Sequence, residues 1–542
     1  MTGGRESDGS NVSRAKKRTA IGARYTSIFA GLAAHSGQIS VGLGQGFSAI
    51  LVPKLLEAQL ADKSETSWIA SLGVISNPLG SVIAGLCAEW FGRRSAIALA
   101  SLPHAAGWLL IALSENTLSM LYVGRFVSGV GMGMANGLYL YVSETAAPNQ
   151  RTWLGSGGPV LVSLGVLMIY TLGTLTTWQR AAAISIGPAI ISLALTRMIP
   201  ETPGWLVARG RKEEAKESLL WLRGPGSNTD KEYAELCAAN LKREEVKESL
   251  FKALHMPSVW KPFLILLTFF AFQQMSGIYI ILFYTVSLLE DVGITLNEYS
   301  ASVGIGVIRL FASVAGAGLA NSFGRKTLAF VSGLGMAISA IGVALAYRYK
   351  LPVVVSLACI GGHVGSSMIG YLTLPWVMTS ELYPLRFRGP LGGITTSMAQ
   401  MLTFAAIKLY PELHVIIGIE WTMWIFAGAA ILGAVFALTI LPETRGRSLD
   451  QIENGFSKKP KIDPSVHIVP SIFVPNKNIT LKKFASISEE KQHNTSTNIY
   501  AYDNFSLDLT TDDIEKNTNK ESAKNPETNR DVHSISLEHV CI

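Results

Sequence analysis

Long apolar segments alternate with short polar ones along most of the chain. A segment of about 18 or more apolar residues is long enough to cross the hydrocarbon core of a bilayer. Because backbone polar groups must be paired inside lipid, such segments are predicted to be helices rather than strands. The pattern predicts an all-α membrane protein with twelve transmembrane helices, at about 27–51, 67–89, 95–113, 118–141, 154–175, 181–199, 262–288, 298–320, 327–347, 352–379, 391–409 and 420–441.

Composition agrees with this class. The 542 residues are 49% hydrophobic and only 16% charged, whereas a soluble protein carries roughly a quarter charged residues. The net charge of +7 comes from basic residues in the short loops. We therefore expect the lipid bilayer as the surrounding partner and no nucleic-acid partner.

The short loops differ in their content of Lys and Arg, which sets orientation. Basic residues are concentrated in the N-terminus and in every second connection, at Arg14, Lys16, Lys17, Arg18, Arg24, Arg93, Arg94, Arg151, Arg325, Lys326, Arg386 and Arg388. Residues 1–25 lack the apolar core of a signal peptide. Both termini and the loop 200–261 are predicted to be cytoplasmic, in a multi-pass protein of the plasma membrane.

Three short motifs occur twice in the same order. EWFGRRS (89–95) returns as NSFGRKT (321–327), SETAAPNQR (143–151) as SELYPLRFR (380–388), and PET (200–202) at 442–444. The copies are separated by 232, 237 and 242 positions, from Gly92 to Gly324, Glu144 to Glu381 and Pro200 to Pro442. Near-constant separations predict two related six-helix halves, the plan of many secondary transporters.

These repeats define the expected domain organisation. It comprises a cytoplasmic N-terminal segment 1–25, a first bundle 26–200, a cytoplasmic linker with short amphipathic helices 201–261, a second bundle 262–441 and a cytoplasmic tail 442–542. The tail is polar from about residue 456 and is predicted to be mostly disordered. We expect it to serve regulation or sorting, and regulatory partners would bind there.

Seven motifs together resemble the sugar porters of the major facilitator superfamily. They are GLCAEWFGRR (85–94), GRFVSGVGMG (124–133), SETAAPNQR, PETPGW (200–205), FQQMSG (272–277), LPWVMTSELYP (374–384) and PETRGR (442–447). The resemblance covers about residues 25–455 and is greatest to the insect branch of facilitated trehalose transporters. It implies gradient-driven sugar transport, of trehalose or glucose for example, by alternating access. It also implies no enzymatic activity, no cofactor and no metal.

The repeated Ser-Glu motifs need cationic partners. Glu144 and Glu381 end apolar segments, and the dipole at a helix C-terminus disfavours a carboxylate. Arginine presents parallel donors that suit this role. The resemblance implies a cytoplasmic gate that latches the halves, formed by Glu89, Arg93, Arg125, Glu144, Arg151, Arg325, Glu381 and Arg388. The alternative is that these charges only anchor helix ends at the membrane surface.

The gate motif departs from the family pattern at one position. An acid usually occupies the place of Glu89, but Asn321 replaces it in the second half. We therefore expect the second cluster to be looser than the first.

Two glutamines are the best candidates for contact with a solute. Gln273 and Gln274 interrupt an apolar segment, and buried amides are costly unless they face a cavity or another polar group. The alternative is that they hold helices together. Trp376 matches the tryptophan that packs under the sugar in the resembled family. Several other family positions differ here, at Pro159, Tyr279, Arg309, Met368, Gln400 and Thr403.

The expected solute site combines these positions, namely Gln273, Gln274, Tyr279, Arg309, Trp376, Gln400 and Thr403. Arg309 stands in mid-membrane, where a guanidinium is expensive. It could hold an anionic group, donate to sugar hydroxyls or stack on Tyr279, or instead snorkel or pair with helix carbonyls. Two other functions therefore stay open. One is a porter for a non-sugar solute, including an anionic one, and the other is a nutrient sensor that does not transport.

The first helix bears on coupling. Proton-driven members of the resembled family carry an acid there, whereas segment 27–51 contains Gln45 and no Asp or Glu. His35 is its one titratable group, and a lone histidine is more often a hydrogen-bonding residue than a proton carrier. Facilitated transport is the prediction.

Overall fold

The computed structural model describes residues 25–115, 117–135, 137–146, 150–224, 229–245, 255–293, 298–384, 387–445, 447 and 449–456. All regular elements in these residues are helices, so the prediction of an all-α protein is confirmed. The expectations for the N-terminal segment and for the tail after residue 456 concern residues outside this described part.

The helices follow the chain in two groups with a linker between them. The first group comprises Tyr25–Glu57 (which includes α2, Gly37–Glu57), α3 (Lys63–Ile75), α4 (Asn77–Phe91), α5 (Arg93–Leu113), α6 (Leu118–Met134), α7 (Gly137–Thr145), α8 (Arg151–Leu175) and α9 (Trp178–Arg197). The linker forms α10 (Pro203–Ala208), α11 (Lys212–Arg223) and α12 (Thr229–Glu245). The second group comprises α14 (Pro257–Met275), α15 (Ile278–Phe283), α16 (Thr285–Asp291), α17 (Glu298–Ser322), α18 (Arg325–Arg348), α19 (Val353–Ile369), α20 (Leu374–Leu382), α21 (Arg388–Thr439) and α22 (Leu449–Phe456).

Nine helical stretches in the described residues are long and apolar enough to cross a membrane. The number differs from twelve partly because α21 covers the last two predicted spans in one run that turns at Gly418. The fourth and seventh predicted spans are divided into shorter helices. The count of twelve stays a prediction.

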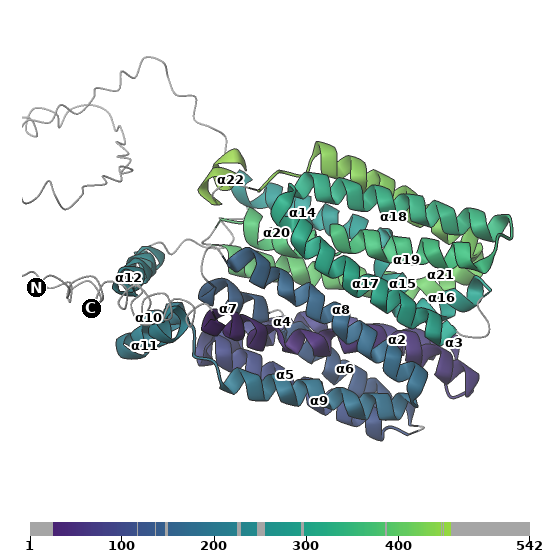
Figure 1. Cartoon of the computed structure of the whole chain (residues 1–542), viewed down its shortest axis with the longest axis horizontal. Helices are drawn as coiled ribbons and strands as arrows, with labels where there is room; N and C mark the ends of the chain where they lie inside the picture. The colour runs from purple at the N-terminus through teal and green to yellow at the C-terminus, as the bar shows by residue number, and fades with distance from the viewer. Residues whose placement is uncertain are drawn as a thin grey trace, which may run out of the picture. The chain divides into compact units, whose positions relative to one another are not determined.

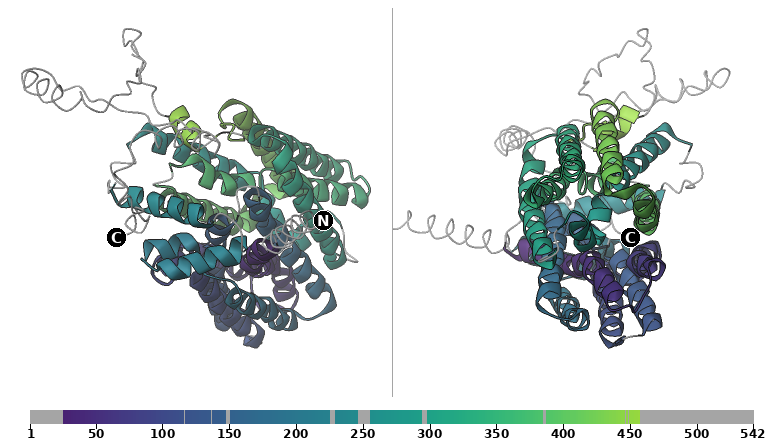
Figure 2. Two further views of the ribbon diagram at one scale, coloured as in Figure 1. Left: turned by 60° about the vertical axis from the view of Figure 1, so that its left-hand side comes forward. Right: turned by 90° about the vertical axis from the view of Figure 1, so that its right-hand side faces the viewer.

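Helices of each group pack mainly on one another. In the first, α5 packs on α6 and α9, and α2 on α8, while in the second α18 packs on α19 and α21. The purple-to-blue helices and the green helices accordingly form two layers (Figure 1), which separate clearly in the right-hand view of Figure 2. We call these layers the first and second halves. They meet along α8 with α17, α3 with α21, and α2 with α15, a surface that we call the seam.

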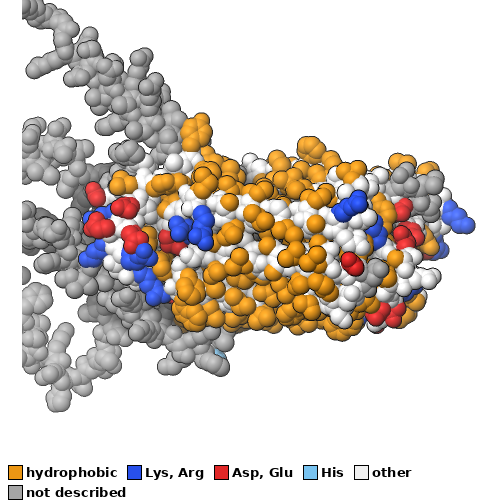
Figure 3. Space-filling view, turned by 90° about the horizontal axis from the view of Figure 1, so that it is seen from below, with side chains coloured by type: hydrophobic (Ala, Val, Ile, Leu, Met, Phe, Trp, Pro, Cys, Tyr) orange, Lys and Arg blue, Asp and Glu red, His pale blue; other side chains and the backbone are white. Residues whose placement is uncertain are grey.

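The outer surface suits a bilayer. Hydrophobic side chains cover the middle of the face in Figure 3, and the charged side chains lie toward its two ends. Large apolar residues such as Phe311, Val354 and Ile416 are more than two-thirds exposed. Because exposed apolar area of this extent is not tolerated in water, the surface agrees with an integral membrane protein.

The predicted seventh span is not one continuous helix. Gly277 has a positive φ of 78° and separates α14 from α15. An added Cβ at this position would lie 2.2 Å from the Phe426 ring. Glycine alone fits both the left-handed backbone and this contact. The break follows directly after Gln273 and Gln274.

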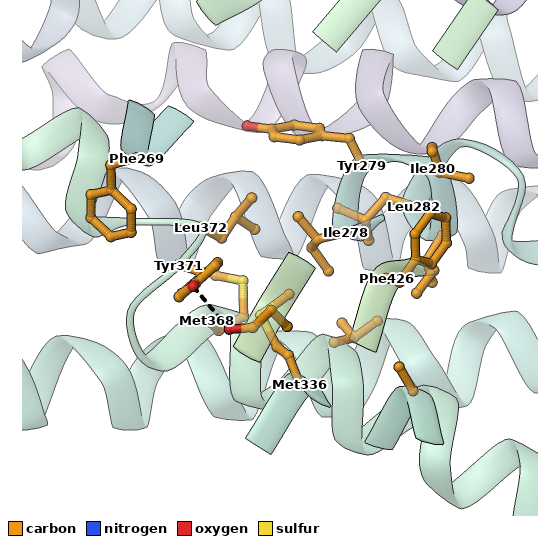
Figure 4. Close-up of a cluster of buried hydrophobic side chains, with 14 of the residues drawn as sticks. Phe269, Ile278, Tyr279, Ile280, Leu282, Met336, Met368, Tyr371, Leu372 and Phe426 are labelled. Atoms are coloured by element: carbon orange, nitrogen blue, oxygen red, sulfur yellow. Dashed lines mark hydrogen bonds between the residues drawn. The ribbon is translucent and has the colours of Figure 1, made fainter. Parts of the chain in front are cut away.

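A cluster of buried side chains surrounds this break. Phe269, Ile278, Met336, Tyr371 and Phe426 belong to it and come from the second half. Tyr279 lies apart from the other labelled side chains, on the side of the first half (Figure 4). Tyr279 belongs to the same cluster, at its edge toward the first half, where α15 contacts α2.

Candidate functional site

Charged side chains of the first half meet where α5 begins. Arg93 is 8% exposed, and its Nε donates to Glu144 Oε1 at 3.1 Å. Its Nη1 donates to Ala88 O at 3.0 Å. Glu89 lies farther off, with its carboxylate 3.9 Å from Arg93 Nη1 and its side chain 62% exposed. We call the end of the bundle that holds this cluster the motif end.

The second half repeats the arrangement at the start of α18. Arg325 Nη2 donates to Glu381 Oε1 at 2.9 Å, and its Nη1 donates to Ala320 O at 2.8 Å. Thr444 Oγ1 donates to the other carboxylate oxygen, Glu381 Oε2, at 2.6 Å. Both oxygens of Glu381 are thus satisfied within its own half.

Among the described side chains, the second cluster is the better connected of the two, which differs from the sequence-based expectation of a looser second cluster. Glu144 Oε2 and Thr202 Oγ1 have no hydrogen-bond partner among the described residues, although Thr202 and Thr444 occupy equivalent PET motifs. Glu89, the acid that Asn321 replaces, adds only a distant and exposed contact. Its loss from the second half therefore removes little.

The glutamates of the PET motifs were missed by sequence reasoning, although their repetition was visible. Glu201 Oε1 accepts from the backbone N–H groups of Arg93 and Arg94 at 2.8 and 3.0 Å. Glu443 accepts likewise from Arg325 N at 2.9 Å and Lys326 N at 3.2 Å. Each carboxylate therefore satisfies the free amides of a helix N-terminus and complements its dipole.

Each of these carboxylates lies so close to the backbone of the Gly-Arg motif that only glycine fits there. An added Cβ would lie 2.2 Å from Glu201 Oε2 at Gly92 and 2.2 Å from Glu443 Oε2 at Gly324. Burial by itself raises the pKa of Glu443, but the backbone donors and Arg325 outweigh it and lower the pKa below its ordinary value. Glu443 is therefore ionised at neutral pH.

Arg125 does not join the motif-end clusters, which corrects the sequence prediction. It lies nineteen positions before Glu144, about 28 Å along helices that rise 1.5 Å per residue. Its guanidinium is fully buried and donates to Ser48 Oγ at 2.6 Å and to the carbonyl of Ile69 at 3.1 Å. The predicted side chains of Arg151 and Arg388 lie outside the described part of the structure.

The opposite end of the bundle joins the two halves. Lys408 of α21 donates from Nζ to Ser67 Oγ at 2.6 Å and lies 4.6 Å from the Trp68 ring centroid. Lys54 of α2 lies 5.2 Å from the centroid of the Tyr299 ring on α17. Each half thus places one lysine over an aromatic ring of the other. An open hollow of about 850 Å³ lies beside Lys54 and Tyr299.

The two predicted glutamines lie together beside the break in the seventh span, and both are buried. Gln273 Nε2 donates to Tyr371 O at 2.5 Å, and its Oε1 accepts from Gln274 Nε2 at 3.2 Å. Gln274 Oε1 has no partner among the described residues. Gln273 thus holds the chain at Tyr371, whereas the acceptor Oε1 of Gln274 is unused within the described residues.

The other predicted site residues have different kinds of partner, some across the seam and some within their own half. Trp376 packs against Phe270, with 5.0 Å between ring centroids. Gln400 of α21 reaches Asn77 of α4 across the seam, with 3.3 Å between their amide groups. Thr403 is buried and its hydroxyl donates to Ala399 O of its own helix at 2.9 Å. No described hydrogen bond joins these three residues to one another.

Arg309 lies at the seam and is 2% exposed. Its Nη2 donates to Gln45 Oε1 of α2 at 3.1 Å. The cation–π contacts of the described residues do not include an Arg309–Tyr279 pair. Sequence reasoning used Gln45 only as evidence against an acid and missed its link to Arg309.

Comparison with known proteins shows which family the chain belongs to. A family model described as "Sugar (and other) transporter" matches residues 21–456. The facilitated trehalose transporter Tret1 of Apis mellifera ligustica is 31% identical over 451 residues, which cover 80% of this chain and 89% of that protein. The Tret1-2 homolog of Drosophila simulans is 29% identical over 470 residues, which cover 83% and 94%.

Solved structures agree on the fold. The proton:xylose symporter XylE bound to 6-bromo-6-deoxy-D-glucose superposes with a TM-score of 0.70 at 22% identity, over 80% of this chain and all of that chain. Inward-open XylE from E. coli gives a TM-score of 0.66 at 22% identity, over 78% and 98%. The predicted major facilitator fold and the resemblance to sugar porters are confirmed.

Proposed function

Because the chain belongs to the sugar (and other) transporter family, we propose that it carries a neutral sugar such as trehalose or glucose down its gradient by alternating access. The observation that carries this proposal is the pair of buried amides at the break beside the seam. Gln274 keeps a free acceptor there, whereas Gln273 fixes the neighbouring chain. Sugar hydroxyls donate to such acceptors, and discontinuous helices form solute sites in many transporters.

The proposed solute site lies between the two halves. It comprises Gln274, Tyr279, Trp376, Gln400 and Arg309, with Gln273 and Thr403 in supporting roles. Trp376 and Tyr279 supply aromatic faces for a sugar ring. This assignment gives Gln273 a structural task because its amide is already bonded at both ends.

The charged clusters and the two lysines serve as gates at opposite ends in this proposal. Each described ion pair among the motif-end residues joins partners of one half, while the lysine contacts cross the seam. Partly buried arginine pairs can exchange partners when the halves rock, since their net worth is modest. The motif end faces the cytoplasm and the protein resides in the plasma membrane.

Uptake of a panel of labelled sugars into vesicles that contain the purified protein tests the function. Saturable uptake that equilibrates and is independent of a proton gradient is expected. Proton-driven accumulation would contradict the facilitated mechanism. Saturable binding without flux would instead identify a sensor, and uptake restricted to acids would identify a different porter.

A further inference from the structure

Arg309 is a buried cation that has no counter-charge among the described residues. It lies eleven positions after the start of α17 and thirteen before its end, which places it near the middle of a span. It is 2% exposed and takes part in none of the ion pairs between described residues. Charged groups inside a membrane are rare and normally paired or directed to water.

Its hydrogen-bonding capacity is mostly unused. A guanidinium carries five N–H donors, and the one described acceptor is Gln45 Oε1, 3.1 Å from Nη2. Nε and Nη1 of Arg309 have no partner among the described residues. Gln45 is neutral, so this bond orients the guanidinium without compensating its charge.

Arg125 shows what a satisfied buried arginine looks like in the same chain. It is equally buried, yet its Nε donates to Ile69 O at 3.1 Å and its Nη1 to Gly44 O at 3.3 Å. Its Nη2 donates to Ser48 Oγ at 2.6 Å and to Ala70 O at 3.3 Å. Every nitrogen of Arg125 has an acceptor. The open nitrogens of Arg309 are therefore specific to its position.

Arg309 lies at the seam, where the two halves meet. Gln45 belongs to α2 of the first half, and α17 packs against α8. One turn before Arg309, an added Cβ at Gly306 would lie 3.2 Å from Leu167 and 3.3 Å from Tyr170 of α8. When the halves rock, the seam opens to one side of the membrane. The guanidinium then becomes accessible from the solute pathway.

We propose that Arg309 is an anion-binding site within the solute pathway and that Gln45 is its positioning residue. The anion is either a carboxylate on the solute, as in a sugar acid, or a chloride ion that accompanies a neutral sugar. Hydroxyl groups accept hydrogen bonds from the open nitrogens but leave the buried charge uncompensated. A charged acceptor does both. This inference rests on the proposed transport function. Chloride would add an anion to a neutral sugar, whereas a solute carboxylate would make the carried sugar an acid.

Two uptake measurements on reconstituted vesicles distinguish the sources of the anion. The first compares labelled glucose or trehalose uptake in chloride with uptake in a bulky sulfonate buffer. The second measures labelled glucuronate uptake. The Arg309→Gln variant should lose about tenfold or more of at least one signal. That signal is either the chloride dependence of sugar uptake or the uptake of glucuronate. The loss is large because charge-assisted hydrogen bonds are among the stronger ones.

Arg348→Gln is the matched control, since Arg348 is an exposed arginine at the far end of α18 and its loss should leave both signals unchanged. Chloride and glucuronate should each be tested for stabilising the purified wild-type protein against heat, a readout that needs no variant to fold. Arg309→Lys keeps the charge and should retain part of the effect.

The outcomes separate this inference from the proposed function. Saturable sugar uptake that ignores chloride, with no glucuronate uptake and no thermal shift from either anion, would overturn the anion site and leave facilitated sugar transport intact. Glucuronate uptake that requires Arg309, with no uptake of neutral sugars, would keep the anion site and overturn the neutral-sugar function.

Discussion

At the scale of single residues, the difference between Gln273 and Gln274 comes from the neighbouring acceptor. Gln273 reaches the backbone carbonyl of Tyr371 just after α19 ends, where Gly370 interrupts the helical hydrogen bonds. A buried amide bonded in this way stabilises the fold. Gln274 donates only to its neighbour and leaves Oε1 open. Adjacent and chemically identical residues thus have different expected roles.

Alanine substitution should separate those roles. Each net hydrogen bond to a neutral solute contributes roughly 0.5–1.5 kcal/mol, so Gln274→Ala should weaken sugar uptake by up to about tenfold with thermal stability preserved. Gln273→Ala should lower the melting temperature, because Tyr371 O loses its donor. The measurements are concentration-dependent uptake and thermal unfolding in detergent. Equal affinities in wild type and Gln274→Ala would exclude Gln274 from the site.

The types of residue in the motifs predicted that ion pairs form, but not every partner of each charged group. The repeated Glu and Arg residues indicated ion pairs, and the structure contains Arg93–Glu144 and Arg325–Glu381. The same reasoning misplaced Arg125, because a motif shows that a charge is needed but not which carbonyl groups surround it. Thr444 was overlooked for a related reason, since a hydroxyl bonded to Glu381 has no charge pattern that marks it.

At the scale of elements, apolar length predicted where helices lie but not where they break. The segment 262–288 contains no charged residue and is long enough for one membrane helix, so its length did not predict the division into α14, α15 and α16. Gly277 in FQQMSG was the one available signal, and glycine within a membrane helix also serves close packing. Only the positive φ and the Phe426 contact show that this glycine breaks the helix.

Gly277→Ala should therefore disable the protein. A non-glycine residue in the left-handed region costs about 1–2 kcal/mol, and the Phe426 ring must also move away from the added methyl group. Gly304→Ala is the matched control, since no atom lies within 4 Å of an added Cβ there. Sugar uptake and thermal stability should both fall in Gly277→Ala and stay near wild type in Gly304→Ala. Equal behaviour of the two variants would show that the break is dispensable.

At the scale of the whole molecule, the duplicated motifs indicated two halves because each motif copy recurs at a similar separation. In the structure, the described ion pairs of the motif end stay within each half, whereas the lysine contacts of the opposite end cross from one half to the other. The lysine contacts of the opposite end were not predicted, because Lys54 and Lys408 have no repeated pattern and meet their rings only after folding. Contacts between halves depend on packing that a single sequence does not encode in short motifs.

Orientation is a separate prediction for the whole chain. The basic residues cluster at the motif end, so that end and both termini should face the cytoplasm. Epitope tags at either terminus should stain only in permeabilised cells, whereas a tag after Leu60, between α2 and α3, should stain intact cells. Surface staining of a terminal tag would reverse the orientation proposed for both gates.

The two gates should act in opposite directions on one equilibrium. Lys408 joins the halves at the opposite end through its contacts to Ser67 and Trp68, so Lys408→Gln should favour states that are open at that end. Glu381 pairs with Arg325 of its own half in this structure. In the proposed gate it exchanges to a partner in the first half when the motif end closes, so Glu381→Gln should favour states that are open at the motif end. Such a shift does not depend on the solute. It changes how often the protein converts between its two open states and leaves the contacts to the solute in place.

Each single variant should therefore slow sugar exchange across vesicles more than it changes sugar binding. The double variant should recover part of the exchange rate, because the two shifts oppose each other. Thr439→Val serves as the control, since its hydroxyl is exposed and bonds only its own helix. Exchange rates and equilibrium binding should be measured on the wild type, the two single variants, the double variant and the control. If the double variant is slower than either single one, the two ends do not share an equilibrium, and the gate assignment fails.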